Sequence, residues 1–230
     1  MNALLSTTYF GPIQWYQKLY RADETWIESC ESFQKQTYRN RCLIATTNGV
    51  QALTVPVERS NLKSQISNLK SQTSARPKDA CYQRDARNLK PQIIRDLRIS
   101  DHGNWRHLHW NALQSAYGDS PFFEYYQDDI RPFFERRWEF LLDFNEAIRQ
   151  SICSLIDICP QVRLTEAFTL TSTADYQDYR DAINPKHPAP DPDFVPRRYY
   201  QVYEAKHGFL PNLSILDLLF NMGPESIFYL

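Results

Sequence analysis

Glycine is scarce in this chain, which has six glycines in 230 residues. The chain contains neither the Gly-x-Gly-x-x-Gly fingerprint nor the Gly-x-x-x-x-Gly-Lys-Ser/Thr loop, so two glycine-rich motifs that hold phosphate are absent. Any phosphate bound by this protein must therefore be held by side chains or by helix termini.

Other absences limit the class of protein. No apolar run approaches the length of a bilayer span, and the opening MNALLSTTYFGP has neither a basic start nor a long apolar stretch. We therefore expect no membrane span and no signal peptide. The five cysteines form no Cys-x-x-Cys pair, which argues against structural zinc and a disulfide framework. This cysteine usage is typical of a reducing cytoplasm, so we expect a cytoplasmic protein without a metal or cofactor.

Charge is balanced along most of the chain. The formal net charge is -1, which gives no reason to expect a nucleic-acid partner. Residues 60–92 differ, because they hold seven Lys or Arg against two Asp and repeat SNLKSQ at 60–65 and 67–72. We interpret 60–92 as a mobile, low-complexity insertion outside the functional site. A basic segment of this kind can also bind a polyanion, and that alternative stays open.

The first part of the chain has clear local signals. LLSTTY (4–9) and TWIESC (25–30) are typical of strands, and 12–22 has apolar residues at helical spacing after Gly-Pro. Such a strand–helix–strand unit favours parallel pairing. CLIATT (42–47) and VQALTVPV (50–57), joined by Asn-Gly, predict a β-hairpin.

Later segments predict a helical middle section. With 42% hydrophobic and 14% aromatic residues, the chain can bury one sizeable core. We predict one α/β domain over 1–230, with a mixed sheet, a strand–helix–strand start, a β-hairpin and a helical middle. The later elements that we expect are strands at 93–100, 162–170 and 198–203, helices at 104–117, 121–135 and about 138–156, a long proline-rich loop at 174–196, and a helix capped by Ser214.

The connection FQKQTYRNRC (33–42) is the first candidate for a binding site. It is short and carries Lys35, Arg39 and Arg41, with Asn40 between the two arginines. If this backbone is extended, the two guanidinium groups point to one side and can grip a phosphate or carboxylate through parallel donors. The alternative is a solvated loop, or arginines paired with acids such as Glu28 or Glu31.

His109 and Asp101 are the candidates for acid–base chemistry. His109 lies on the apolar stripe of the helix predicted at 104–117, and Asp101 comes just before that helix. If the carboxylate reaches the imidazole, the pair serves as a general base. The alternative for His109 is a hydrogen-bonded core residue.

Arg180 is a further candidate for binding an anion. It lies in DYRD at the entry to the proline-rich loop, a segment that could fold over a ligand. A solvated loop charge is the alternative.

Three spaced blocks of the chain have a recognisable pattern. They are YFGPIQWYQKLYRAD with FQKQTYRNRC and LTVPV, then Trp105-x3-His109-x3-Leu113 with AY and PFF, and finally DYRDAINPK with YYQVY and GFLPNLSILDLLFNMGP. Together they resemble the WbqC-like protein family over nearly the whole chain except 60–92. Many members of that family have His-Gln-Pro where this chain has Ser6, Thr7 and Thr8. A reaction that needs that histidine would be lost here.

The resemblance implies a functional hypothesis. Some members of the family are found with surface-polysaccharide biosynthesis, and transfer of an acyl or aminoacyl group onto an amino sugar has been suggested for them. The expected substrate is therefore an anionic, nucleotide-linked amino sugar. Its phosphate would bind Lys35, Arg39, Asn40, Arg41 and Arg180, and His109 with Asp101 would deprotonate the acceptor.

A non-catalytic binding or assembly protein is the second hypothesis. Tyr, Trp and Phe are enriched at protein interfaces, and this chain is rich in them. The aromatic residues that could form such a partner surface are Tyr9, Trp15, Tyr16, Phe122, Phe123, Tyr125, Tyr126, Phe133 and Phe134.

Overall fold

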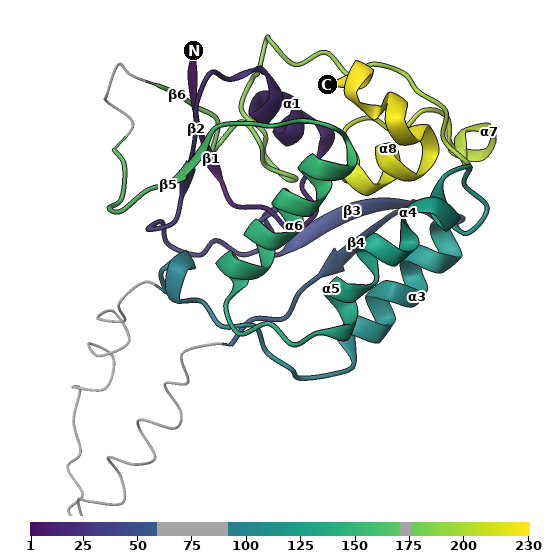
Figure 1. Cartoon of the computed structure of the whole chain (residues 1–230), viewed down its shortest axis with the longest axis horizontal. Coiled ribbons are helices and arrows are strands. Elements are labelled where there is room, and N and C mark those ends of the chain that lie inside the picture. Colours follow the sequence, from purple (N-terminus) through teal and green to yellow (C-terminus); the bar gives the residue numbers. More distant parts are fainter. Residues whose placement is uncertain (59–91, 171–175) are drawn as a thin grey trace, which may run out of the picture.

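A computed structural model of the chain describes residues 1–58, 92–170 and 176–230 (Figure 1). The insertion predicted at 60–92 therefore lies outside the described residues, apart from Gln92. The strands are β1 (Asn2–Ser6), β2 (Thr25–Glu28), β3 (Arg41–Thr46), β4 (Gly49–Thr54), β5 (Val162–Leu164) and β6 (Tyr176–Asp178). The helices are α1 (Ile13–Arg21), α3 (Trp105–Tyr117), α4 (Phe123–Ile130), α5 (Pro132–Glu135), α6 (Leu141–Leu155), α7 (Glu204–His207) and α8 (Ile215–Met222), with 3-10 turns η2 (Ile94–Asp96) and η3 (Gly223–Tyr229).

Four short parallel strands form one sheet in the order β5-β2-β1-β6. β1 pairs with β2 in the register Ala3 to Thr25, as the strand–helix–strand prediction requires. On its other side β1 pairs with β6, which lies inside the segment predicted as a loop. Because the chain leaves β1 toward β2 while β6 lies on the opposite side, β1 is a switch point in the sheet. The carboxyl ends of parallel strands at such a point are a common place for a ligand site.

The β-hairpin is confirmed. β3 pairs antiparallel with β4 from Arg41 opposite Thr54 to Thr46 opposite Gly49. Gly49 has a φ of 101°, which a residue with a side chain rarely adopts, so the Asn-Gly turn fits its sequence. In Figure 1 the hairpin lies between the four-stranded sheet and the helices α3, α4 and α5.

The helical middle section is also present. α3, α4, α5 and α6 follow one another between residues 105 and 155. The single helix predicted at 121–135 is two helices, because Pro132 has no N–H for the turn before it and starts α5 instead. Ser214 caps α8 as predicted, since its hydroxyl accepts a hydrogen bond from the Leu216 amide at 3.3 Å.

Two predicted strands are wrong. Residues 93–100 form a 3-10 turn flanked by isolated bridges, which join Ile93 to Ser32, Arg98 to Phe140 and Ile99 to Val57. Each partner is a different part of the chain, so no ladder forms. Residues 198–203 keep the alternating burial of a strand, but none of the described strands pairs with them. Their buried side chains, Tyr199 and Gln201, instead hydrogen-bond to the Asp217 carboxylate.

The fold class is confirmed as mixed α/β. One hydrophobic cluster runs from Ala3 near the N-terminus to Leu230 at the C-terminus. The C-terminal residue is held against α1, because the Arg21 guanidinium donates to the Leu230 carbonyl at 2.9 Å. None of the described helices is long and apolar enough to cross a bilayer.

Candidate functional site

Arg39 lies at the carboxyl ends of the parallel strands, where two of its guanidinium nitrogens are hydrogen-bonded. Its Nε donates to Glu31 at 2.7 Å, and its Nη2 donates to Glu31 and to the Ser6 hydroxyl, the latter at 2.8 Å. Both charged side chains are buried. A buried pair of this kind must stay together, because either charge alone would be strongly destabilising. Arg39 is therefore not free to bind an external anion.

Arg180 follows β6 and is held in a similar way. Its Nε donates to Asp178 at 3.0 Å, and its Nη1 lies 3.4 Å from a Glu28 oxygen. Burial lowers the pKa of the guanidinium, but the contacts with these two carboxylates outweigh it and raise the pKa above its usual value. Glu28 is itself fully buried and accepts further bonds from the Cys30 amide and Thr165 hydroxyl.

The two arginines share one small cavity at the switch point of the sheet. It measures about 10 Å³ and is lined by Ser6, Thr7, Thr8, Trp15, Tyr38, Arg39, Tyr179, Arg180 and Ile183. Ser6, Thr7 and Thr8, at and just after the end of β1, are thus part of this wall. A space of this size holds about one water molecule, so the edge of the sheet is filled by its own ion pairs.

Asn40 explains why the two neighbouring arginines separate. Its side-chain amide donates to the Val55 backbone carbonyl at 2.8 Å, and the backbone carbonyl of Asn40 accepts from the Val55 backbone amide at 2.8 Å. The segment before it is a turn in which Gln36 has a φ of 61°, so the chain is not extended. Arg39 therefore faces the sheet and Arg41 the outer side of the hairpin, and the predicted convergence of the two guanidinium groups is not observed.

A larger cavity lies on that outer side. It measures about 340 Å³ and is lined by Phe33, Lys35, Gln36, Asn40, Arg41, Thr54, Val55, Pro56, Val57 and Gln92. Arg41 uses its Nε to donate to the Thr54 hydroxyl at 3.1 Å, which fixes the guanidinium over β4. In the described part of the chain no carboxylate pairs with Lys35 or Arg41. We call this space the hairpin cavity.

His109 lies in the aromatic core. Its Nδ1 is 2.9 Å from the Tyr9 hydroxyl, and the rings of Trp105, Phe134 and Tyr9 surround it. Burial lowers the pKa of the imidazole to about 4, although a backbone hydrogen bond with Thr54 opposes the shift. The ring is therefore neutral at pH 7. Burial also raises the pKa of the Tyr9 hydroxyl, which stays protonated and shares a hydrogen bond with Nδ1.

Asp101 is not brought to His109. Its carboxylate binds Arg106 at 2.6 Å and lies 3.7 Å from Arg137. Neither His109 nor Asp101 lines the hairpin cavity. Their catalytic role stays a prediction, but the expected contact between them is absent from the described hydrogen bonds.

The aromatic partner surface is not where the sequence suggested. Of the nine residues named for it, only Tyr125 is mostly exposed, at 74%, and Phe122 is partly buried. The other seven lie in the core. Core packing therefore accounts for most of the aromatic content.

The sequence indicates two of the three acidic partners, since Glu28 and Glu31 are candidates for pairing with the arginines of the 33–42 connection, but it does not single out Asp178. Glu28 and Asp178 are the last residues of β2 and β6, and Glu31 follows β2. This position is the signal for the network, since carboxyl ends of parallel strands meet at one edge. Among residues 1–58, 92–170 and 176–230, no three His, Cys, Asp or Glu side chains group as metal ligands would.

These features define an α/β protein with a filled carboxyl edge and an open cationic cavity beside its hairpin. The chain belongs to the WbqC-like protein family, whose model matches residues 7–84 and 84–184. It is 27% identical over 254 residues to the uncharacterized protein Rv1507c of Mycobacterium tuberculosis, covering 99% of this chain and 96% of that protein. No solved structure matches the chain.

Proposed function

We propose that this protein is a transferase that acts on an anionic sugar, and that the hairpin cavity holds the phosphate of that substrate. One observation carries the proposal: Lys35 and Arg41 line a cavity of about 340 Å³ without a described carboxylate to neutralise them. This volume is within the range of small-molecule sites. The two cations suit a phosphate, because guanidinium and ammonium both donate to its oxygens.

Asn40 and Thr54 give the cavity its rigidity. Asn40 fixes the backbone to Val55 on both sides, and Thr54 fixes Nε of Arg41. The terminal nitrogens of Arg41 then face a substrate from a held position, which reduces the entropy lost on binding. In this account Arg39 and Arg180 position the edge of the sheet, and Lys35 and Arg41 bind the anion.

The class of reaction rests on the family. Its resemblance supports transfer of an acyl or aminoacyl group onto a nucleotide-linked amino sugar in surface-polysaccharide biosynthesis. Cys30, Cys42, Cys153 and Cys159 are free thiols, which supports the cytoplasmic location that belongs to this proposal. His109 and Asp101 stay predicted catalytic residues outside the cavity.

The test is thermal unfolding with a panel of nucleotide-linked amino sugars. A ligand present at a hundred times its dissociation constant stabilises the folded protein by about 2.7 kcal/mol. We expect such a shift for at least one member of the panel, and we expect Arg41→Ala to remove it. Arg198→Ala is the matched control, because Arg198 is an exposed arginine that is paired with Glu204 and does not line the cavity. An Arg41→Ala protein that responds like wild type would refute the assignment.

A further inference from the structure

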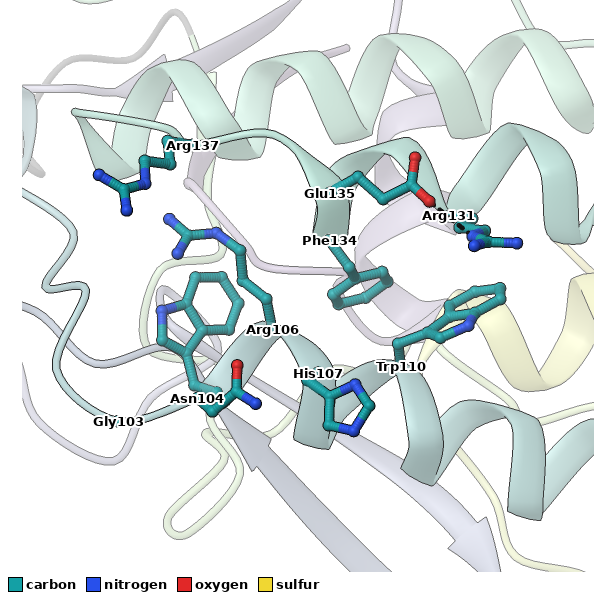
Figure 2. A pocket seen from close by; sticks show the side chains of 10 residues that line it. Gly103, Asn104, Arg106, His107, Trp110, Arg131, Phe134, Glu135 and Arg137 are labelled. Carbon is teal, nitrogen blue, oxygen red and sulfur yellow. Dashed lines mark hydrogen bonds and ion pairs between the residues drawn. The ribbon is translucent and has the colours of Figure 1, made fainter.

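A second cavity lies at the start of α3, apart from the hairpin cavity (Figure 2). It measures about 360 Å³. Its lining is Gly103, Asn104, Trp105, Arg106, His107, Trp110, Arg131, Phe134, Glu135 and Arg137. None of these residues lines the hairpin cavity. We call it the arginine–tryptophan cavity.

Arg106 is the most informative residue of this cavity. Its guanidinium lies over the Trp105 ring, 4.6 Å from the centroid, and Nη1 donates to Asp101 at 2.6 Å. Nε and Nη2 are enclosed, and no described residue accepts a hydrogen bond from either. These two N–H groups form one edge of the guanidinium, the edge that holds two oxygens of a phosphate or carboxylate side by side. A charged group with two enclosed, unused donors is costly unless something satisfies them.

The charges around the cavity favour an anion. The arginines and acids in or beside the lining are Arg106, Arg131 and Arg137 against Glu135 and Asp101, so these groups carry a formal charge of +1. The Glu135 carboxylate forms an ion pair with Nε of Arg131 at 2.6 Å, and the Asp101 carboxylate accepts a hydrogen bond from Nη1 of Arg106. Arg137 is 86% exposed on its side chain and can swing toward a ligand.

The start of α3 adds donors of its own. Asn104 caps the helix without a side-chain hydrogen bond to the first turn, so amides of that turn keep their donors. Gly103 and Asn104 both line the cavity. The helix has 13 residues, and the positive end of its dipole adds to the field of the arginines.

The opposite end of the cavity is aromatic. Trp110 and Phe134 lie with ring centroids 5.9 Å apart and form this wall together in Figure 2. Trp110 is only partly buried. An aromatic wall next to a guanidinium fork suits a ligand with a flat ring at one end and a phosphate at the other, because bases stack on aromatic side chains.

We propose that the arginine–tryptophan cavity is a second, separate site that binds a nucleoside phosphate. The phosphate lies at the Nε and Nη2 edge of Arg106, whose side chain shifts to open these two enclosed nitrogens to it. Arg137 closes over the phosphate, and the base lies against Trp110 and Phe134. This site goes beyond the proposed transferase site and does not depend on it.

The experiment is isothermal titration calorimetry of the full chain with UMP, AMP, inorganic phosphate and the uncharged nucleosides. It is run with the wild-type protein and with Arg41→Ala, which lacks the guanidinium proposed to bind an anion in the hairpin cavity. We expect a nucleoside monophosphate to bind in both, more tightly than inorganic phosphate or the nucleoside. Arg106→Met keeps the packing on Trp105 and should weaken binding about tenfold or more.

Two further variants keep the test independent of folding. Arg137→Ala alters an exposed side chain and should also weaken binding, whereas Arg136→Ala, an exposed neighbour outside the lining, should leave it unchanged. The proposal is overturned if no nucleoside monophosphate binds, or if binding in the Arg41→Ala background is the same with and without Arg106 and Arg137. That result leaves the transferase proposal standing, since its readout is the Arg41-dependent shift with nucleotide sugars.

Discussion

At the scale of single residues, two arginines that are two positions apart in the sequence have opposite roles. Arg39 is buried against Glu31, and Arg41 lies in the hairpin cavity. The sequence gives the same two interpretations for both, an external anion or a pairing with an acid such as Glu28 or Glu31, because both carry the same group in one short connection. It could not predict the separation, since Glu31 and the Asn40–Val55 bonds become neighbours of the arginines only after folding.

The buried pair of Arg39 and Glu31 gives the first prediction. Arg39→Met leaves the Glu31 carboxylate buried without its partner, and we expect a loss of about 3–5 kcal/mol in the free energy of unfolding. Adding Glu31→Leu should recover much of this loss, because both charges are then gone. Chemical denaturation measures both effects.

A surface ion pair provides the control for the Arg39 and Glu31 variants. Arg98 and Glu139 form an ion pair whose side chains are more than half exposed, and Arg98→Ala should cost at most about 1 kcal/mol. Equal losses for Arg39→Met and Arg98→Ala would mean that the Arg39 pair is not a structural contact.

His109 gives the second prediction, which concerns pH. Its pKa is about 4 in the folded protein and 6.5 in an ordinary peptide. Between these two pH values the imidazole is protonated in the unfolded chain but neutral in the folded protein. Stability from the neutral ring is complete above about pH 6.5 and is lost as the pH falls toward 4. The loss is about 3 kcal/mol.

The comparison for this prediction is His109→Gln. Between pH 6.5 and 4 the free energy of unfolding should fall less steeply in this variant than in wild type. Parallel pH profiles for the two proteins would show that His109 titrates normally and is not enclosed as described.

At the scale of elements, local sequence signals identify the helices and strands that pack or pair with elements adjacent in the sequence. The β1–α1–β2 unit and the β3–β4 hairpin follow from periodicity and from Gly-Pro and Asn-Gly. β6 could not be found this way, because it has three residues and becomes a strand only by pairing with β1. Residues 198–203 fail for the reverse reason: Tyr199 and Gln201 alternate like a strand, but both bond to the Asp217 side chain.

The proline-rich segment gives the third prediction. Asp191 accepts from the Lys18 ammonium at 2.9 Å and from the Gln14 amide at 2.8 Å, so one buried carboxylate ties this segment to α1. Asp191→Ala leaves the Lys18 charge buried and unpaired. We expect the segment to open and to be cleaved faster in limited proteolysis.

Asp193 is the matched control for the contact of Asp191 with Lys18 and Gln14. It lies two residues away on the same segment and is exposed, and it makes no described ion pair. Asp193→Ala should therefore be cleaved at the wild-type rate. If the two variants are cleaved alike, Asp191 does not hold the segment.

At the scale of the whole molecule, fold class is easier to predict than function. Hydrophobic content and periodicity give a mixed α/β protein with a helical middle, and the aromatic residues fill its core. The site is only partly predictable. Lys35, Asn40 and Arg41 line one cavity, whereas Arg39 is paired with Glu31 and Arg180 with Asp178 and Glu28. The arginine–tryptophan cavity is not predicted, because its lining joins residues 103–110 to residues 131–137 and only folding brings the two stretches together.

The most direct test of the central claim is an anomalous-difference map of crystals soaked with tungstate, an anion that resembles phosphate. The account predicts a peak between Lys35 and Arg41 that is lost in Arg41→Ala crystals, with Arg39 still bound to Glu31. Tungstate bound by Arg39 or Arg180 at the edge of the sheet, with none in the hairpin cavity, would contradict it.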